Sequence, residues 1–410
     1  MNLKLTWLAK FKEKETIDVV KLLLLFLIIF TFSLNLFYKI SLDGAYVHGL
    51  LIDYLIPKVY LAEFLIIPFL IIEAKQLKKI KISTSFCFLV LILLVRQLLS
   101  QNALAAFTHL LHFAEILLFF NAIKSDPLFK TKMAEKFILG AMLSTLLFQS
   151  LLAIHQFIFQ QSLLSYQFLG ETNLSDLANI SRAQFFFGEK ILPYGTLAHP
   201  NILAGLVVIF SILIFNKIKG EWKIKLILIL NALLIVFMTQ SIAALLTLGL
   251  FFLYLFLDRI KAKKIIVVAV YYFFIILLPY LLSLSTSMSP KLDSIDRRVA
   301  LNESAFEMFG SNPFFGVGIN NFTVVLEKYS MGSINNEVVR FVQPVHNLLF
   351  LILSEGGLLL LVVLFLLIRQ TQIDSFYQKS MILLAIASLD HYFLTQFGGF
   401  GILAVFYLFI

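Results

Sequence analysis

The chain alternates long apolar runs with short polar stretches over almost its whole length. A helix that crosses the hydrocarbon of a bilayer needs about 20 mostly apolar residues, and roughly twelve runs approach that length. The pattern therefore predicts an all-α, polytopic transmembrane bundle of about 12 spans. The predicted spans lie near residues 19–38, 57–73, 83–99, 103–122, 135–159, 198–216, 222–239, 241–257, 264–283, 347–368, 378–394 and 396–410.

Basic residues fall in alternate connections of this pattern, namely the amino-terminal segment and the stretches 75–81, 124–136, 217–225, 259–264 and 369–379. Short loops rich in lysine and arginine stay on the cytoplasmic side, so both termini are predicted to be cytoplasmic. Residues 1–283 would then hold roughly nine spans, with an outer loop near 160–197, and residues 346–410 about three more. Between them, residues 284–345 are predicted to form one long extracytoplasmic loop with short helices.

Composition agrees with a membrane protein. Of 410 residues, 60% are hydrophobic and 14% are charged, a balance that a soluble protein would not need. The net charge of +9 comes from basic residues in the loops. These residues are not combined with aromatic ones in a surface that could bind nucleic acid. The single cysteine, Cys87, provides neither a disulfide framework nor a thiolate metal cluster. The first apolar run lacks a cleavage site and predicts a helix that stays attached.

Residues 296–309 of the long loop have apolar positions Leu301, Ala305 and Met308 at helical spacing. One interpretation is a short amphipathic helix on the membrane surface or the protein body. Arg298 belongs to the same stripe, whereas Arg297 is turned about 100° away. An inward guanidinium fits a phosphate or a carboxylate, so a ligand contact is the other interpretation.

A glycine turn follows, from Asn312 to Phe322, with Gly316 and Gly318 two residues apart. Glycines in a tight turn would let backbone N–H groups approach a ligand closely. The pair could equally form only a turn.

His346 and Asn347 follow Pro344 and precede a long apolar run, which places His346 at the mouth of a membrane helix. The positive helix N-terminus disfavours imidazolium, so His346 is predicted to be neutral and able to accept a proton. A lone histidine there could also be only a satisfied polar group. Glu355, deeper in the same helix, is predicted to be a packing carboxylate rather than a catalytic one.

Taken in order, these residues resemble the O-antigen ligase and polymerase superfamily of bacterial membrane glycosyltransferases. Members have an arginine that begins a loop helix, a Pro-x-x-Gly-x-Gly-x-x-x-Phe turn, and a His-Asn pair before a helix containing Glu-x-Gly. A Pro-Asn-x-x-Ala-Gly element opens an earlier span. The matching residues are Arg298, Pro313, Gly316, Gly318, Phe322, His346, Asn347, Glu355, Gly357 and, in the earlier element, Pro200, Asn201, Ala204 and Gly205.

The chain departs from the family pattern in particular places. Ile242 stands where members commonly have an arginine, and Arg340 or Arg182 from the outer loops could replace that charge. Asn302 stands where an aromatic residue is common, and a Gly-Thr-Gly pattern typical of ligases is missing near Leu360. Ligase and polymerase therefore both stay open.

The resemblance implies a bundle like the type C glycosyltransferases in the bacterial inner membrane. It implies transfer of an oligosaccharide from undecaprenyl diphosphate, or another polyprenyl diphosphate, to a hydroxyl of an acceptor glycan at the outer face. The acceptor would be a lipid A core in lipopolysaccharide biosynthesis or a growing polysaccharide. His346 would be the base and Arg298 the diphosphate contact, with Asn201, Asn347, Gly316, Gly318, Arg182 and Arg340 near substrate.

No metal or cofactor is expected, because the outer loops have no acidic cluster with metal-ligand spacing. His109, His112 and Glu115 share a helical face but lack further ligands. Glu63, Arg96, Glu115 and His155 are ionisable groups at membrane depth, which makes them candidate functional residues. A lipid-linked oligosaccharide flippase is the alternative function, but its charges should line a path through the membrane.

Overall fold

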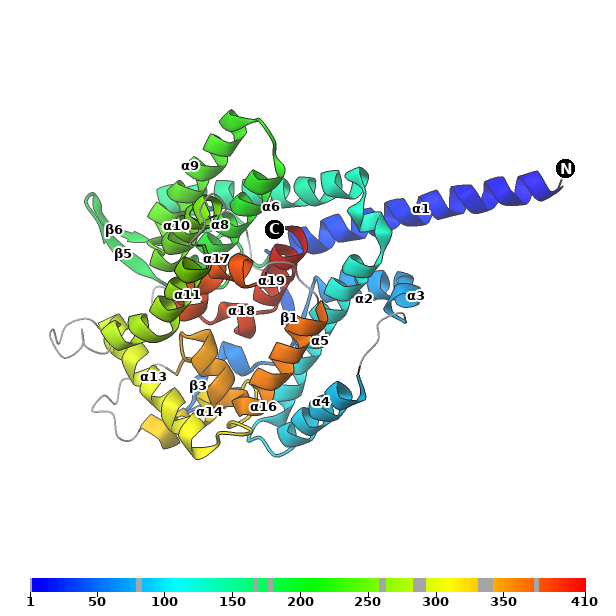
Figure 1. Cartoon of the computed structure of the whole chain (residues 1–410). Coiled ribbons are helices and arrows are strands. Elements are labelled where there is room, and N and C mark those ends of the chain that lie inside the picture. Colours follow the sequence, from blue (N-terminus) through cyan, green and yellow to red (C-terminus); the bar gives the residue numbers. More distant parts are fainter. Residues whose placement is uncertain are drawn as a thin grey trace.

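The computed structural model describes residues 2–78, 83–164, 169–175, 180–257, 263–282, 293–330, 342–371 and 376–410. These residues are mostly helical (Figure 1), as predicted. The helices of the first half are α1 (Asn2–Thr31), α2 (Glu63–Ile72), α3 (Ala74–Leu77), α4 (Thr84–Gln97), α5 (Ala103–Ser125), α6 (Lys132–Phe159) and α8 (Pro200–Lys217). Short 3-10 turns are η1 (Asp53–Leu55) and η2 (Pro127–Lys130).

The second half contains α9 (Trp222–Thr239), α10 (Ile242–Leu257), α11 (Lys263–Tyr272) with its π-helical continuation η3 (Phe273–Leu277), α13 (Asp293–Ser311), α14 (Phe322–Ser330), α16 (Leu348–Thr371), α17 (Phe376–Leu389), α18 (Tyr392–Thr395) and α19 (Phe397–Phe409). In Figure 1, α13, α14 and α16 lie together, away from α6, α8, α9 and α10. The short helix α18 lies between the two groups.

Three antiparallel two-stranded sheets occur among the described residues, which the apolar pattern did not predict. Strand β1 (Phe37–Lys39) pairs with β4 (Lys58–Tyr60), and β2 (Tyr46–Val47) pairs with β3 (Leu50–Leu51) between them. Strands β5 (Arg182–Phe185) and β6 (Gly188–Ile191) form a hairpin before α8.

Six described helices are long and apolar enough to cross a membrane: residues 103–125, 132–159, 200–217, 222–239, 264–282 and 348–370. Five shorter apolar helices accompany them in the described part of the chain. The predicted number of about 12 spans is thus not confirmed. Two predicted spans differ clearly: 57–73 is a strand followed by the ten-residue α2, and 378–394 is interrupted after Leu389. Asp390 and His391, which are polar, occupy that interruption.

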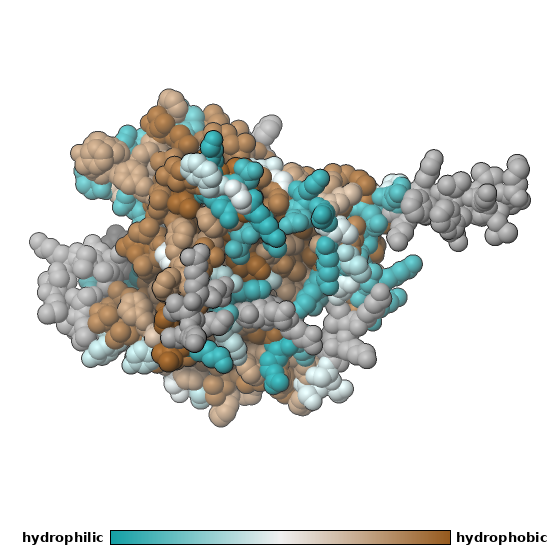
Figure 2. Space-filling model, turned by 45° about the horizontal axis from the view of Figure 1, so that its top comes forward, coloured by the Kyte–Doolittle hydropathy of each residue, from teal (hydrophilic) through white to brown (hydrophobic). Residues whose placement is uncertain are grey.

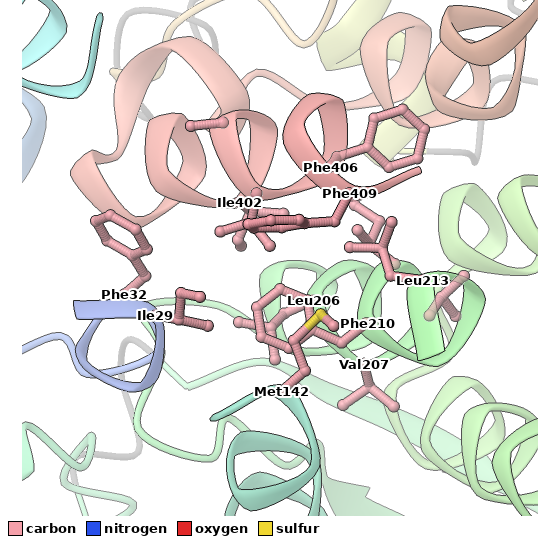
Figure 3. Packing of buried hydrophobic residues seen from close by; sticks show 14 of the residues in the cluster. Ile29, Phe32, Met142, Leu206, Val207, Phe210, Leu213, Ile402, Phe406 and Phe409 are labelled. Atoms are coloured by element: carbon pink, nitrogen blue, oxygen red, sulfur yellow. The ribbon is translucent and has the colours of Figure 1, made fainter. Parts of the chain in front are cut away.

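The main core forms where α1, α6, α8 and α19 meet (Figure 3). Helix α8 is its centre, since Leu203, Leu206, Phe210 and Leu213 are fully buried. His199 caps α8 by accepting a hydrogen bond from Asn201 N–H, and Pro200 fits the first turn, where no amide donor is needed. The sequence at 199–201 therefore sets where this central helix begins.

A second core joins α13 to α14 and α16. Leu301, Ala305 and Met308 of α13 are buried, as their helical spacing predicted. They pack with Phe322 and other apolar residues of α14 and α16. The outward surface is also rich in apolar side chains: hydrophobic residues cover much of the face in Figure 2, and hydrophilic ones gather toward its middle.

Candidate functional site

A cavity of about 320 Å³ lies where four distant segments of the chain meet. The segments are the turn around η1, the start of α8, the residues before α16, and the break between α17 and α18. It is lined by Leu51, Ile52, Asp53, Tyr54, Ala198, His199, Asn201, Ile202, Val342, Gln343, Pro344, His346, Asp390, His391, Tyr392 and Gln396. Its walls include three histidines and two acidic residues, so it is rich in groups that can move protons.

His346 lies just before α16, as its sequence position predicted, and it lines this cavity. Its ring meets that of His391 edge to face, with the centroids 4.9 Å apart. Its Nδ1 atom is buried and has no hydrogen-bond partner among the described residues. Burial, with a smaller effect of His391, lowers the pKa of His346 to about 3, while Asp390 opposes the shift. The imidazole is therefore neutral at physiological pH.

Asp390 connects the two sides of the cavity. Its Oδ2 accepts a hydrogen bond from Nδ2 of Asn201, 3.2 Å away, and its Oδ1 accepts one from the His391 amide, at 2.8 Å. Burial raises the pKa of this carboxyl, but the neighbouring rings of His391, His346 and His199 together bring it below its usual value. A negative charge consequently lies beside three imidazoles.

His391 and His199 complete the polar wall. Nδ1 of His391 lies 2.7 Å from the hydroxyl of Thr395, and Nε2 of His199 lies 3.4 Å from the hydroxyl of Ser181. His391 is half-buried and His199 has an exposed edge, yet desolvation by the surrounding protein lowers the pKa of both, and Asp390 partly offsets this. Both are therefore neutral proton acceptors or donors under ordinary conditions.

Arg298 lies on α13 next to this group, although it is not among the residues that line the cavity. Its charge lowers the pKa of His346, His391 and His199, and Asp390 in turn raises the pKa of the guanidinium, which burial lowers. No described residue accepts a hydrogen bond from it, and its side chain is half-buried. Residues 298 and 346, distant in sequence, thus share one electrostatic environment.

The glycine turn faces the protein and does not present its amides to a ligand. The amide of Gly316 donates to Asn312 O at 2.9 Å, and that of Gly318 donates to Glu355 O at 2.9 Å. Both N–H groups are therefore already satisfied by the protein. The turn packs into a break in α16 at Gly357, whose φ of 61° is left-handed.

Glu355 has the packing role predicted for it. Its Oε1 accepts hydrogen bonds from the Tyr54 hydroxyl at 2.5 Å and from Phe322 N–H at 3.0 Å, and Oε2 accepts one from Asn320 N–H at 2.9 Å. Arg96 holds the same turn from outside, because its Nη2 donates to Gly316 O at 3.1 Å. These contacts fix the turn against α16.

The remaining predicted substrate residues are placed differently. Arg182 forms an ion pair with Glu189 across the β5–β6 hairpin, at 3.2 Å, and does not line the cavity. Arg340 lies outside the described residues. Asn347 caps α16, since its Oδ1 accepts from Phe350 N–H at 3.2 Å, whereas Asn201 does line the cavity.

A separate polar group forms around His112 and Glu63, at the depth of the apolar helices. Nε2 of His112 lies 3.1 Å from Lys58 O and 3.5 Å from Oε1 of Glu63. Within the described residues, no group of three His, Cys, Asp or Glu has the arrangement needed for a metal ion. The expectation that catalysis needs no metal stays a prediction.

The sequence interpretation missed His199 as a cavity residue, and it missed Asp390 and His391 entirely. The sequence did contain a signal for Asp390 and His391. Ionisable residues within a long apolar run cost free energy in a membrane, so such a pair indicates a functional role. Their partner Asn201 lies 189 residues earlier, and that contact has no local signature.

Part of the chain matches a known protein family. Residues 226–365 match the family model described as O-Antigen ligase. This segment contains Arg298, the glycine turn and His346, whereas His199, Asp390 and His391 lie outside it. No curated protein matches the chain.

Proposed function

We propose that this chain, a multi-pass membrane protein of the O-antigen ligase and polymerase superfamily, is a glycosyltransferase that uses a polyprenyl-diphosphate oligosaccharide as donor. The acceptor is a hydroxyl of a glycan, and the reaction takes place at the outer face of the cytoplasmic membrane. The observation that carries the proposal is the neutral, half-buried His346 in a cavity beside Asp390 and the charge of Arg298.

In the proposed reaction, the acceptor oxygen attacks the anomeric carbon of the donor sugar. The bond from that carbon to the diphosphate oxygen breaks, and the polyprenyl diphosphate leaves with the bonding electrons. The hydroxyl proton passes to His346, which must be neutral to accept it. Asp390 raises the pKa of His346 against the effect of burial, so it stabilises the imidazolium formed in this step.

The leaving diphosphate gains negative charge, which a positioned cation stabilises. Arg298 is the proposed cation, because its guanidinium has no hydrogen-bond acceptor among the described residues and its planar fork suits phosphate oxygens. Asn201 is held at the wall of the polar cavity by its hydrogen bond to Asp390. Arg182 and Arg340 remain proposals for further diphosphate contacts.

An apolar groove supports a lipid-linked donor. It has a volume of about 390 Å³ and runs between α5, α16, α17 and α19. Leu348 and Leu394 line it close to His346 and His391, whereas Phe376 and Tyr407 line it elsewhere. A polyprenyl chain in this groove would hold its diphosphate near the polar cavity.

The test is transfer in vitro from a synthetic polyprenyl-diphosphate oligosaccharide by the purified full-length chain. His346→Gln should lower the rate about 10²–10⁴-fold, the usual contribution of a general base. Arg298→Gln should lower it about 10²–10³-fold, as loss of a donor to a developing negative charge does.

Two other residues of the same types provide matched controls. Arg297→Gln removes the adjacent arginine, and His48→Gln removes a half-exposed histidine that pairs with Glu327 instead of lining the cavity. Both should retain transfer. Unchanged product with His346→Gln contradicts the mechanism, and loss of lipid transport without loss of transfer favours a flippase.

A further inference from the structure

A second cavity, of about 390 Å³, lies at the opposite end of α8 from the candidate site. His199 caps the first turn of α8 and Lys217 is its last residue. The 18 residues of this helix extend about 27 Å, so the two cavities are separated by nearly the thickness of a bilayer core. The second cavity is lined by Phe120, Ile123, Lys124, Phe129, Lys130, Thr131, Glu135, Ile138, Leu139, Met142, Lys217, Lys379, Tyr407, Leu408 and Phe409.

The charged side of this cavity is basic. The described lysines that line it are Lys124, Lys130, Lys217 and Lys379, and each comes from a different element: α5, η2, α8 and α17. Glu135 is the one acidic residue among the described lining residues. Helix α6 begins beside Thr131, so the positive end of a 28-residue helix adds to the lysine charge. The cavity should therefore attract an anion.

The opposite side of the cavity is apolar. Ile123, Ile138 and Met142 are buried there, and Phe120 and Tyr407 are shared with the apolar groove between α5, α16, α17 and α19. The lysine cavity and the groove thus adjoin at these two residues. Leu348 and Leu394 line the groove near the candidate site, so the lysine cavity adjoins a different part of it.

We infer that this cavity binds the phosphate headgroup of an anionic phospholipid, with an acyl chain entering the adjoining groove. Basic pockets between membrane helices on the lysine-rich side are suited to anionic headgroups. The apolar wall would contribute nothing to a free phosphate ion, but it would bury the hydrocarbon next to the headgroup. The volume is within the range of ordinary ligand sites. This inference does not depend on the transfer reaction.

The test measures binding of dihexanoyl phosphatidylglycerol to the purified full-length chain in a neutral detergent. The wild type should bind it at least about tenfold more tightly than dihexanoyl phosphatidylcholine. The double variant Lys130→Gln/Lys217→Gln should lower that affinity about 25-fold, because each lysine near an anionic lipid contributes roughly fivefold. Melting temperatures without lipid confirm that the variants are folded, and each single variant is measured too.

The matched control is Lys219→Gln/Lys223→Gln, which removes the same charge from exposed positions just after α8 and in the first turn of α9, outside the cavity. It should change the affinity less than twofold. If the two double variants lost the same affinity for the lipid, binding would reflect general attraction to the charged surface, and the inference would be overturned. Equal binding of both lipids, no loss in either single variant, or inorganic phosphate binding as tightly as the lipid would also overturn it.

Discussion

At residue 346 the protein keeps a histidine neutral in a polar cavity. The nearby carboxylate of Asp390 favours imidazolium, but burial, His391 and the charge of Arg298 outweigh it. The result is a base that is unprotonated before substrate arrives and has a counter-charge beside it once it accepts a proton. A general base needs both properties: its nitrogen must be unprotonated when it takes the hydroxyl proton, and the cation that forms must be stabilised.

This balance predicts an unusual pH dependence. A histidine with an ordinary pKa of about 6.5 would lose base activity progressively below neutral pH. Because burial lowers the pKa of His346 to about 3, the imidazole stays deprotonated far below that point. Initial rates of transfer should therefore show no acidic limb from His346 between about pH 8 and pH 5. A limb with an apparent pKa between about 6 and 7 that disappears in His346→Gln would contradict this assignment.

Local sequence identified only part of the polar cavity. His346 lines it and Arg298 lies beside it, and each has a local signal: a histidine before a helix, and an arginine on an apolar helical stripe. His199 has the local role of capping α8, which concealed its place in the cavity, whereas Asn201 was expected near substrate from the family resemblance. Asp390 joins them through a contact with Asn201 that depends on how α8 packs beside the α17–α18 break. Such a contact follows from packing and not from spacing along the chain.

Among the elements, the glycine turn and α16 fit together through mutual backbone contact. Val317 N–H donates to Ser354 O at 2.8 Å, and Leu358 N–H donates to Pro313 O at 2.9 Å. A Cβ atom at Gly316 would lie 2.3 Å from the carbonyl carbon of Glu355, and one at Gly357 would lie 2.6 Å from that of Phe314. These glycines are needed because two backbones approach closely, not because a ligand does.

Replacing Gly357 with alanine should therefore destabilise the protein strongly. The left-handed φ alone costs an alanine about 1–2 kcal/mol, and the contact with Phe314 adds to it. We expect the free energy of unfolding in detergent to fall by at least about 2 kcal/mol. The control is Gly310→Ala, since a Cβ there meets nothing and an alanine inside α13 gains up to about 1 kcal/mol. Equal stability of the two variants would show that the close approach is not needed.

The spacing of apolar residues predicted helix α13 correctly but did not predict the structure of residues 57–73. In α13 the apolar residues recur with the helical repeat and face one partner surface, so sequence and structure agree. The predicted span at 57–73 is also mainly apolar, but its residues Lys58–Tyr60 pair as strand β4 with β1 across an intervening segment of the chain. An apolar run alone does not distinguish a short strand from the beginning of a membrane helix. The expected span at 57–73 was wrong for that reason.

The whole molecule is organised around α8. This helix is buried along most of its length, has His199 of the candidate site at one end, and has Lys217 of the lysine cavity at the other. A helix of this length and apolarity can cross a bilayer. The proposed chemistry and the proposed lipid site would then lie on opposite sides of the membrane, in agreement with the placement of lysine-rich loops on the cytoplasmic side.

That arrangement predicts which exposed residues a reagent can reach from outside. In a Cys87→Ser background, Phe186→Cys puts a thiol at the β5–β6 turn, where Phe186 is 92% exposed, and Lys219→Cys puts one just after α8. A membrane-impermeant maleimide should label Phe186→Cys in intact spheroplasts, and should label Lys219→Cys only after permeabilisation. The two sites flank α8, so equal labelling of both in intact spheroplasts would mean that α8 does not cross the membrane. The reverse labelling pattern would place His346 and its cavity on the cytoplasmic side of the membrane. The orientation inferred from the lysine-rich loops would then be wrong.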